Sequence, residues 1–398
     1  MTSDHAFDPA APLPGPPDPW AFASTPTRRD EPPYHLTDMI AAEPALARRV
    51  LARVAANDGG GNELATAIRA AVSDRAPVVV TGCGTSETAA MGIVEILREA
   101  LRAAGMRDAA VHSAQAFELA FNPPAHGLVI GVTHEGGTGA TNGALGAARA
   151  AGANTAVLTV SRRSPAGKAA DLVVETGELD QSWCHSVGYL SPLLVGAAVG
   201  AVLSGRPIDA GAISGLLAAG ARDEAGAERM AARLGSADRL IVVGSGADRS
   251  AGHELVVKVE EASWLPSAYR DLETLLHGHF PAIGQDSGLV MILVDRDGRA
   301  ERLARARQAL AAAQVIGIRA AAILAADLDA EIDPELTPAG RLLVDEAPGL
   351  PAPVAALFGT ATPLQLLTER LARARGTNPD PIRRDDPLSA AAAKAAGG

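Results

Sequence analysis

The sequence predicts an α/β fold with two parallel sheets in tandem. Residues 78–86 read VVVTGCGTS, a short apolar run that ends in small residues and glycines and opens into a helical apolar pattern. The same pattern returns at 240–246 as LIVVGSG. A buried parallel strand is a continuous apolar run, and the glycine turn after it leaves backbone N–H groups at a helix N-terminus, where an anion or polar ligand can bind. Two such units indicate a duplicated α/β domain.

Composition narrows the class of protein. The 398 residues are 47% hydrophobic and 20% charged, enough for two or three domains with cores. A net charge of −11 disfavours a nucleic-acid groove. The two cysteines, Cys83 and Cys184, cannot form a disulfide framework. The N-terminus lacks the basic and apolar pattern of a secretion signal. We also expect no apolar run to reach the roughly 18 to 20 residues of a membrane helix. We therefore expect a cytoplasmic protein that acts on small molecules and contacts neither nucleic acid nor membrane.

The N-terminal third begins with an arm and a helix. Residues 1–33 are rich in proline, and we expect an irregular arm that Trp20 and Phe22 could anchor on a neighbour or partner subunit; a disordered tail is the alternative. Apolar residues at helical spacing predict a leading helix over 35–54, with Thr37 as its N-cap.

The first unit alternates strands with helices. We predict strands at 78–82, 109–112, 127–132, 154–160 and 171–175, with helices at 86–104 and 137–151. This alternation favours right-handed crossovers and a parallel sheet, whose ligands collect at the carboxyl ends of the strands. The polar turns at 82–86, 133–138 and 178–186 are therefore the candidate ligand segments.

The second unit repeats the architecture more than the sequence. Helical stretches at 187–203 and 210–234 lead to predicted strands at 239–243, 288–294, 315–323 and 341–344 and predicted helices at 249–264, 298–313 and 353–374. We expect a polar loop over 266–285 and a frayed tail at the C-terminus. The expected domains are the arm 1–33, the first domain 34–208, the second domain 209–375 and a C-terminal loop and tail 376–398.

Several motifs resemble the double-SIS (sugar isomerase) domain family, which includes the isomerase half of glucosamine-6-phosphate synthase. GCGTS at 82–86 resembles the family's Gly-Thr-Ser turn, and THEGGTGAT at 133–141 resembles its Ser-Gln-Ser-Gly-Glu-Thr phosphate loop. VKVEEAS at 257–263 and ETLLHG at 273–278 are similar to its Lys-Glu-Ile-Ser and Glu-Leu-Lys-His-Gly elements, and GTNPD at 376–380 matches the start of its C-terminal loop. The resemblance implies two tandem SIS domains, each a three-layer α/β sandwich with a parallel sheet.

The candidate base lies on the helix of the second unit. Aldose–ketose isomerisation needs a base that moves a proton between C1 and C2 of an open-chain sugar. Glu254, Lys258 and Glu261 recur at i, i+4 and i+7 and share one helical face. By pattern alone, a solvated charged face with a helix salt bridge is the simpler interpretation. The resemblance implies instead that Glu261 is the catalytic base when Ser263 is aligned with the serine of the motif, with Glu260 as the alternative register.

A second catalytic group is implied by the resemblance. His277 matches the family's histidine that assists ring opening, often from the partner subunit, and an imidazole exchanges protons near neutral pH. We therefore expect a homodimer with shared active sites. His277 and His279 also form a His-x-His pair that could bind a metal. Without a further ligand in the sequence we expect no metal, and the implied chemistry needs no organic cofactor.

The phosphate loop departs from the family. The resemblance implies ligand contacts from Gly84, Thr85, Ser86, Thr133 and Thr138, but His134 and Glu135 stand where Gln and Ser are expected. A carboxylate about 4 Å from a phosphate costs roughly 1 to 4 kcal/mol. Three explanations are open. The substrate lacks this phosphate, the substrate presents a hydroxyl or amine to Glu135, or a protonated His134 offsets the negative charge of Glu135. Alternatively, Glu135 turns outward and phosphate binds as usual.

Two further departures alter the expected pocket. The family often has a lysine after the GTNPD segment, whereas Pro387 aligns there, and Arg383 and Arg384 cannot form a Schiff base. Residues 183–187 (WCHSV) replace the family's Ala-Ser-Thr-Lys segment, which makes His185 a candidate polar group in the pocket.

These residues predict a sugar or amino-sugar aldose–ketose isomerase or deaminase that acts through an enediol or enediolamine. The chain begins Met1-Thr2-Ser3 without the synthase's cysteine nucleophile, so we do not expect glutamine-dependent amination. The alternative is a catalytically inactive SIS subunit that senses a sugar or regulates a partner. The proline-rich arm cannot form a helix-turn-helix, and the presence of both Glu261 and His277 favours an enzyme.

Overall fold

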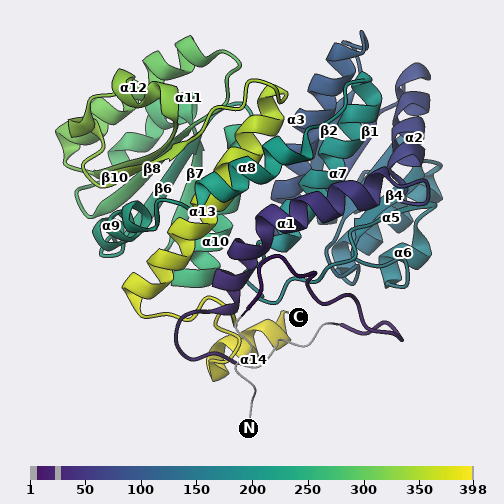
Figure 1. Ribbon diagram of the computed structural model, residues 1–398, viewed down its shortest axis with the longest axis horizontal. Coiled ribbons are helices and arrows are strands. Elements are labelled where there is room, and N and C mark those ends of the chain that lie inside the picture. The colour runs from purple at the N-terminus through teal and green to yellow at the C-terminus, as the bar shows by residue number, and fades with distance from the viewer. Residues whose placement is uncertain (1–6, 23–27, 397–398) are drawn as a thin grey trace.

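The computed structural model describes residues 7–22 and 28–396 and contains two five-stranded parallel sheets (Figure 1). In the first sheet the strand order is β2-β1-β3-β4-β5, and in the second it is β10-β9-β8-β6-β7. The first sheet consists of β1 (Val78–Gly82), β2 (Val111–Gln115), β3 (Leu128–Val132), β4 (Asn154–Thr159) and β5 (Leu172–Glu175). The second consists of β6 (Arg239–Gly244), β7 (Ser267–Asp271), β8 (Ser287–Leu293), β9 (Arg319–Ala325) and β10 (Gly340–Val344).

Helices cover both faces of the first sheet, because alternate residues of its strands point to opposite sides. Val78 and Val80 pack with α3 and α7 in one core, whereas Val79 packs with α4 and α5 in another. The helices of this half are α1 (His35–Ala55), α2 (Gly61–Ser73), α3 (Thr85–Ala103), α4 (Ala116–Phe121), α5 (Gly139–Ala151), α6 (Pro165–Ala169) and α7 (Val187–Ser204).

The second sheet is covered in the same way. Leu240 and Val242 pack with α9, α10 and α13, whereas Ile241 and Val243 face α12. The α-helices of this half are α8 (Ala210–Gly220), α9 (Glu224–Leu234), α10 (Asp248–Ser263), α11 (Leu272–Thr274), α12 (Arg299–Ile316), α13 (Ala352–Arg375) and α14 (Pro387–Ala395). Short turns of other helix types are η1 (Leu275–His279), η2 (Phe280–Ala282), η3 (Ala326–Glu331) and η4 (Pro334–Leu336). Each half is thus a three-layer α/β sandwich, as predicted.

Helix α7 corrects one expectation. Its 18 residues have a mean hydropathy of 1.8 and are by length and composition sufficient to cross a membrane, which the sequence analysis did not foresee. Of its residues, 83% are buried in the folded chain, where the helix packs against α3, α1 and α2.

Other local predictions also need correction. The polar loop expected over 266–285 contains the edge strand β7, and the tail expected to fray forms α14. Thr37 is not the N-cap of α1: Tyr34 is, and its backbone N–H donates to Thr37 Oγ1 at 3.1 Å. The described part of the arm is irregular, as predicted, but it packs on its own chain.

Candidate active site

The C-terminal half of α10 carries a buried cation between two carboxylates. Lys258 is 1% exposed, and its Nζ lies 2.5 Å from Glu261 Oε2 and 3.9 Å from Glu254 Oε1. Burial alone would lower the pKa of Lys258, but the neighbouring carboxylates outweigh it and hold the pKa above its ordinary value. Lys258 is therefore an ammonium ion at neutral pH.

Burial excludes the simpler interpretation of this helical face. Glu254 is fully buried and accepts a hydrogen bond from Thr88 Oγ1 of α3, so the pair joins the two halves of the chain. Burial raises the pKa of Glu254 to about 7. Glu261 keeps 28% of its side chain exposed and is the member of the group that a ligand can reach.

The structure also distinguishes the two alignments of the motif, which place either Glu260 or Glu261 at the position of the base. Glu260 is exposed and accepts a hydrogen bond from the Ser267 backbone N–H at 3.0 Å, which fastens it to the start of β7. Glu261 instead faces Lys258. The carboxylate that shares the buried cation is thus Glu261.

The N-terminus of α3 lies at the carboxyl edge of the first sheet. Gly84 adopts φ +57° just before the helix, a conformation that side chains disfavour, and no side chain caps this helix among the residues that the structure describes. Thr85 is buried at the first helical position, while Ser86 is partly exposed. Backbone N–H groups at such a terminus favour an anion or a polar oxygen.

Residues 133–138, here termed the ligand loop, follow β3 at the same edge. Thr133 is buried, and its Oγ1 donates to Thr138 Oγ1 at 3.3 Å. Glu135 is partly exposed. Hydroxyl groups from both ends of the loop therefore lie together.

His134 corrects the hypothesis of a protonated histidine. Its Nε2 accepts a hydrogen bond from the Asp180 backbone N–H at 2.9 Å, which requires that nitrogen to carry no proton. Burial lowers the pKa of His134 to about 4. At neutral pH the ring is uncharged and cannot offset Glu135.

His185 lies beside this ring. The two imidazole centroids are 5.3 Å apart. Burial, together with the positive charges of Lys258 and Arg384, keeps the pKa of His185 well below its ordinary value. The neighbouring Cys184 Sγ lies 4.0 Å from the Lys258 carbonyl oxygen, so the loop that carries His185 packs directly on α10.

The C-terminal loop closes this side of the site. Asp380 accepts hydrogen bonds from the His35 and Leu36 backbone N–H groups at 2.8 and 2.9 Å, and its own carbonyl accepts from Trp183 N–H at 3.1 Å. The Arg384 guanidinium lies 4.8 Å from the Trp183 ring centroid. Sequence reasoning did not name Lys258 and Arg384 among the candidate site residues; the signal for Lys258 was its helical spacing from Glu261.

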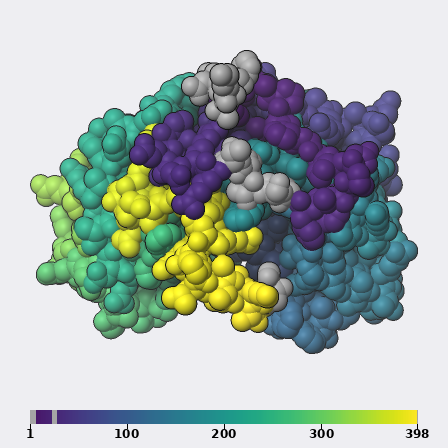
Figure 2. Space-filling view, turned by 90° about the horizontal axis from the view of Figure 1, so that it is seen from below, coloured from purple at the N-terminus to yellow at the C-terminus, as the bar shows by residue number. Residues whose placement is uncertain are grey.

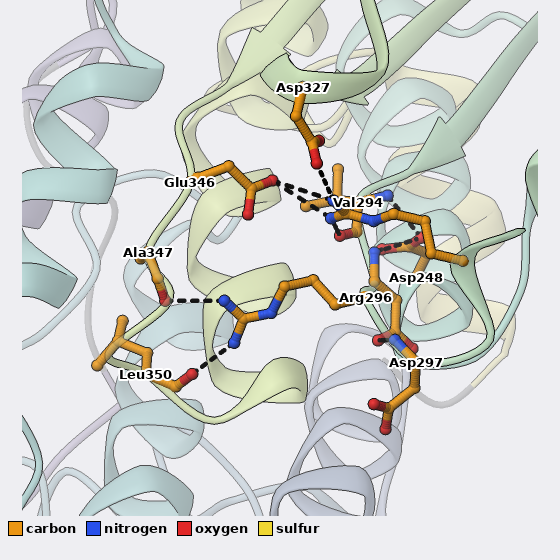
Figure 3. Close-up of polar contacts among 10 residues, drawn as sticks. Asp248, Val294, Arg296, Asp297, Asp327, Glu346, Ala347 and Leu350 are labelled. Atoms are coloured by element: carbon orange, nitrogen blue, oxygen red, sulfur yellow. Dashed lines mark hydrogen bonds and ion pairs between the residues drawn. The ribbon is translucent and has the colours of Figure 1, made fainter. Parts of the chain in front are cut away.

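The matching edge of the second sheet is closed by the chain's own charges (Figure 3). Asp248 is buried and accepts from the Val294 and Asp295 N–H groups at 2.9 and 3.1 Å. The Asp295 carboxylate accepts from Ala247 N–H at the start of α10 and pairs with Arg302 at 2.8 Å. The Asp295 carboxylate thus caps the N-terminus of α10, whereas the corresponding N-terminus of α3 has no such cap. We therefore take the carboxyl edge of the first sheet as the candidate ligand edge.

His277 is not close to Glu261 in the same chain. Helix α10 begins at the carboxyl edge of the second sheet and ends at its amino edge, and β7 then returns to the carboxyl edge just before η1. The 16 residues of α10 span about 24 Å. The His277 side chain is 70% exposed, and its Nε2 lies 2.7 Å from Glu273 Oε1. Within one chain the topology therefore places Glu261 and His277 toward opposite edges of the second sheet.

Metal binding gains no support from the folded arrangement. Among residues 7–22 and 28–396, no group of three or more His, Cys, Asp or Glu side chains could hold a metal ion. His279 Nδ1 instead accepts a hydrogen bond from Arg270 Nε at 3.1 Å.

The fold consists of two tandem three-layer sandwiches, with the candidate ligand edge on the first sheet. No protein-family model and no curated protein matches the sequence. Solved structures do match the fold. The C-terminal domain of glucosamine-fructose-6-phosphate aminotransferase from Francisella tularensis aligns with a TM-score of 0.75 at 16% identity, over 89% of this chain and 99% of that chain.

Two other solved structures give the same result. Tagatose-6-phosphate ketose/aldose isomerase from Escherichia coli aligns with a TM-score of 0.67 at 16% identity, over 90% of this chain and 98% of that one. Glucosamine-6-phosphate deaminase from Thermotoga maritima aligns with a TM-score of 0.56 at 18% identity, over 84% and 97% of the two chains. The resemblance to the double-SIS family drawn from the motifs is therefore confirmed at the level of the fold.

Proposed function

We propose that this chain is a sugar or sugar-phosphate aldose–ketose isomerase or amino-sugar deaminase of the SIS type. The observation that carries the proposal is the pair of Lys258 and Glu261, a buried ammonium bonded to a partly exposed carboxylate at the junction of the two domains. Similarity to a ketose/aldose isomerase and to a glucosamine-6-phosphate deaminase supports this class of reaction.

In the proposed reaction Glu261 is the base. Its carboxylate takes a proton from the carbon next to the carbonyl or imine of the open-chain sugar. The C–H electron pair becomes the C=C bond of an enediol or enediolamine, and the carbonyl oxygen or imine nitrogen gains a proton. Glu261 then returns its proton to the neighbouring carbon, while the hydroxyl or amine on the first carbon loses a proton and becomes the new carbonyl or imine. This loss balances the proton gained by the original oxygen or nitrogen and completes isomerisation. In the deaminase version, water hydrolyses the resulting imine and releases ammonia.

Lys258 orients the proposed base. The short contact between its Nζ and Glu261 Oε2 fixes the position of the carboxylate. The substrate's oxygens or phosphate would be held by Thr85 and Ser86 at the N-terminus of α3 and by Thr133 and Thr138 of the ligand loop. Gly84, His134, Glu135 and His185 complete the proposed binding residues.

The proposal includes assembly and domain organisation. His277 of a second copy would assist ring opening, so the active form would be a homodimer. The domains would span 34–208 and 209–375, and segment 376–398 would close the site. Cytoplasmic location stays a prediction from composition.

A sugar-sensing or regulatory subunit is the second candidate. Pro387 stands where the family often has a lysine, and Arg383 and Arg384 stack over Trp264 and Trp183 instead of offering an amine. A chain that lacks the ring-opening lysine could bind a sugar without turning it over.

One screen separates the two candidates. The purified protein would be incubated with hexoses, amino sugars and their 6-phosphates, with interconversion followed by proton NMR and binding by calorimetry. An isomerase or deaminase converts at least one member of the panel. Binding without conversion of any sugar would favour the sensor.

A further inference from the structure

The described arm, residues 7–22, is anchored on the first domain by a buried carboxylate. Leu13 is 6% exposed, and its backbone N–H donates to Glu178 Oε2 at 2.9 Å. Glu178 is 2% exposed and pairs with Arg49 of α1 at 2.8 Å. The Leu179 N–H donates to the Pro14 carbonyl oxygen at 2.9 Å, as a strand would. The arm is therefore packed onto the first domain through specific hydrogen bonds.

Further along, the arm is held by an arginine that follows β4. The Arg163 guanidinium donates to the Pro16 and Pro17 carbonyl oxygens at 3.2 and 3.1 Å and pairs with Asp18 at 3.2 Å. In Figure 2 the purple N-terminal segment lies against the blue first domain. After these contacts the arm continues to Phe22, which lies at the ligand loop.

Phe22 lies on the ligand loop itself. A Cβ atom added at Gly137 would lie 2.0 Å from Phe22 Cε1, so the ring occupies the space that a side chain at Gly137 would need. Trp20 packs edge-on against this ring, with centroids 4.9 Å apart. The ring is in contact with the loop backbone even though 64% of Phe22 is exposed.

The arm thus connects the two loops that form the ligand edge. His134 of the ligand loop accepts its hydrogen bond from Asp180, directly after the segment at 178–179 that holds the arm. Phe22 contacts the other end of the same loop at Gly137. The ligand loop is held from both ends by parts of one connected unit.

We propose that Phe22 is a positioning residue for ligand binding, which fixes the ligand loop by filling the space over Gly137. The inference rests on the proposed function only in taking 133–138 as the loop that holds the substrate. An aromatic side chain outside the two domains then sets the geometry of their ligand site.

The test measures loop mobility without any substrate. Hydrogen–deuterium exchange of the backbone amides at 134–138 would be followed by mass spectrometry in the full chain. Phe22→Ala is expected to speed this exchange about fivefold, whereas Phe22→Leu, which refills the space, restores most of the protection. Exchange that is unchanged in Phe22→Ala would overturn the proposal.

A pair of glycine variants supplies a matched second test. Gly137→Ala must displace the Phe22 ring, while Gly139→Ala places its Cβ where no atom lies within 4 Å. Exchange at 134–138 is expected to rise in Gly137→Ala and not in Gly139→Ala. Equal behaviour of the two variants would contradict the proposed contact.

Binding of glucosamine 6-phosphate by calorimetry then links the contact to function. Phe22→Ala is expected to weaken binding about fivefold by the same loss of loop order, while Phe22→Leu restores it. Faster exchange with unchanged affinity would overturn the positioning role in ligand binding. If Phe22→Ala speeds exchange but even the unaltered chain does not bind glucosamine 6-phosphate, the loop contact is supported and the proposed substrate class is contradicted. Binding of inorganic phosphate would then be measured to decide whether the loop binds anions at all.

Discussion

Lys258 places one ammonium between two carboxylates, 2.5 Å from Glu261 Oε2 and 3.9 Å from Glu254 Oε1. The carboxylates lie four residues before and three residues after it, so one helical face presents the whole group. Glu254 is bonded to Thr88 of the first domain, and Glu261 is the member open to a ligand. The arrangement makes Lys258 both a structural link and an electrostatic partner of the proposed base.

Removal of this cation should destabilise the fold. Lys258→Met leaves Glu254 buried without its counter-charge, and breaking a buried pair in this way costs about 3 to 5 kcal/mol. Adding Glu254→Gln should recover part of the loss, because a neutral amide needs no counter-charge. Urea unfolding of the two variants measures both effects; a loss below about 1 kcal/mol in Lys258→Met would mean that Glu254 needs no counter-charge, as when it takes up a proton.

Glu43 should make stability depend on pH. It is fully buried, accepts from Thr362 Oγ1 at 2.8 Å, and burial raises its pKa from 4.5 to about 8. A raised pKa means that the folded state binds the proton more tightly, so this stabilisation is complete below pH 4.5 and is lost as pH rises through 8. Glu43→Gln cannot ionise.

The comparison of the two proteins isolates this carboxyl group, because all other buried acids are common to both. The free energy of unfolding would be measured by urea titration from pH 5 to about 9. The difference between Glu43→Gln and the unaltered chain should shift in favour of the variant as pH increases. Parallel curves over this range would mean that Glu43 is ionised throughout.

Glu135 should weaken the binding of phosphorylated sugars. A carboxylate about 4 Å from a phosphate costs roughly 1 to 4 kcal/mol, so Glu135→Ser should tighten binding of glucose 6-phosphate about tenfold relative to binding of glucose. Calorimetry with the two sugars checks this, and the neutral sugar serves as the control. Equal affinity of both proteins for the phosphorylated sugar would mean that Glu135 points away from it.

A shared active site should appear in a mixing experiment. Glu261→Gln and His277→Ala are each expected to be nearly inactive, but each retains the group that the other lacks. After the two variants are unfolded and refolded together, about a quarter of the unaltered activity should return, because half of the random dimers carry one intact site. Absence of any recovery, with mixed dimers demonstrated by differently tagged chains, would mean that the two subunits share no active site. Full activity of His277→Ala alone would place His277 outside the site.

The sequence was sufficient where burial follows from pattern. The apolar runs before Gly82 and Gly244 are central strands covered on both faces, so their strands and turns could be predicted. Strand β7 was missed because SAYRD lies at a sheet edge and is only partly buried, which leaves no apolar run to detect. Edge strands take their structure from the neighbour that they pair with.

Site residues could be named from motifs, but their environments could not. Glu254 and Lys258 share the pattern of a solvated helix face, and only packing against Thr88 and the 184–185 loop reveals that they are buried. Likewise, the neutral state of His134 follows from the Asp180 N–H, 46 residues away in sequence. The contact of Phe22 with Gly137 joins segments that no local pattern relates.

The most direct test of the account is transfer of solvent deuterium to C2 of a convertible sugar, followed by proton NMR. Glu261→Gln and Glu260→Gln form a matched pair, since the two carboxylates are adjacent but only Glu261 contacts Lys258. We predict that exchange is lost by at least about a hundredfold in Glu261→Gln and is nearly unchanged in Glu260→Gln. Exchange that persists in Glu261→Gln would contradict its role as the base.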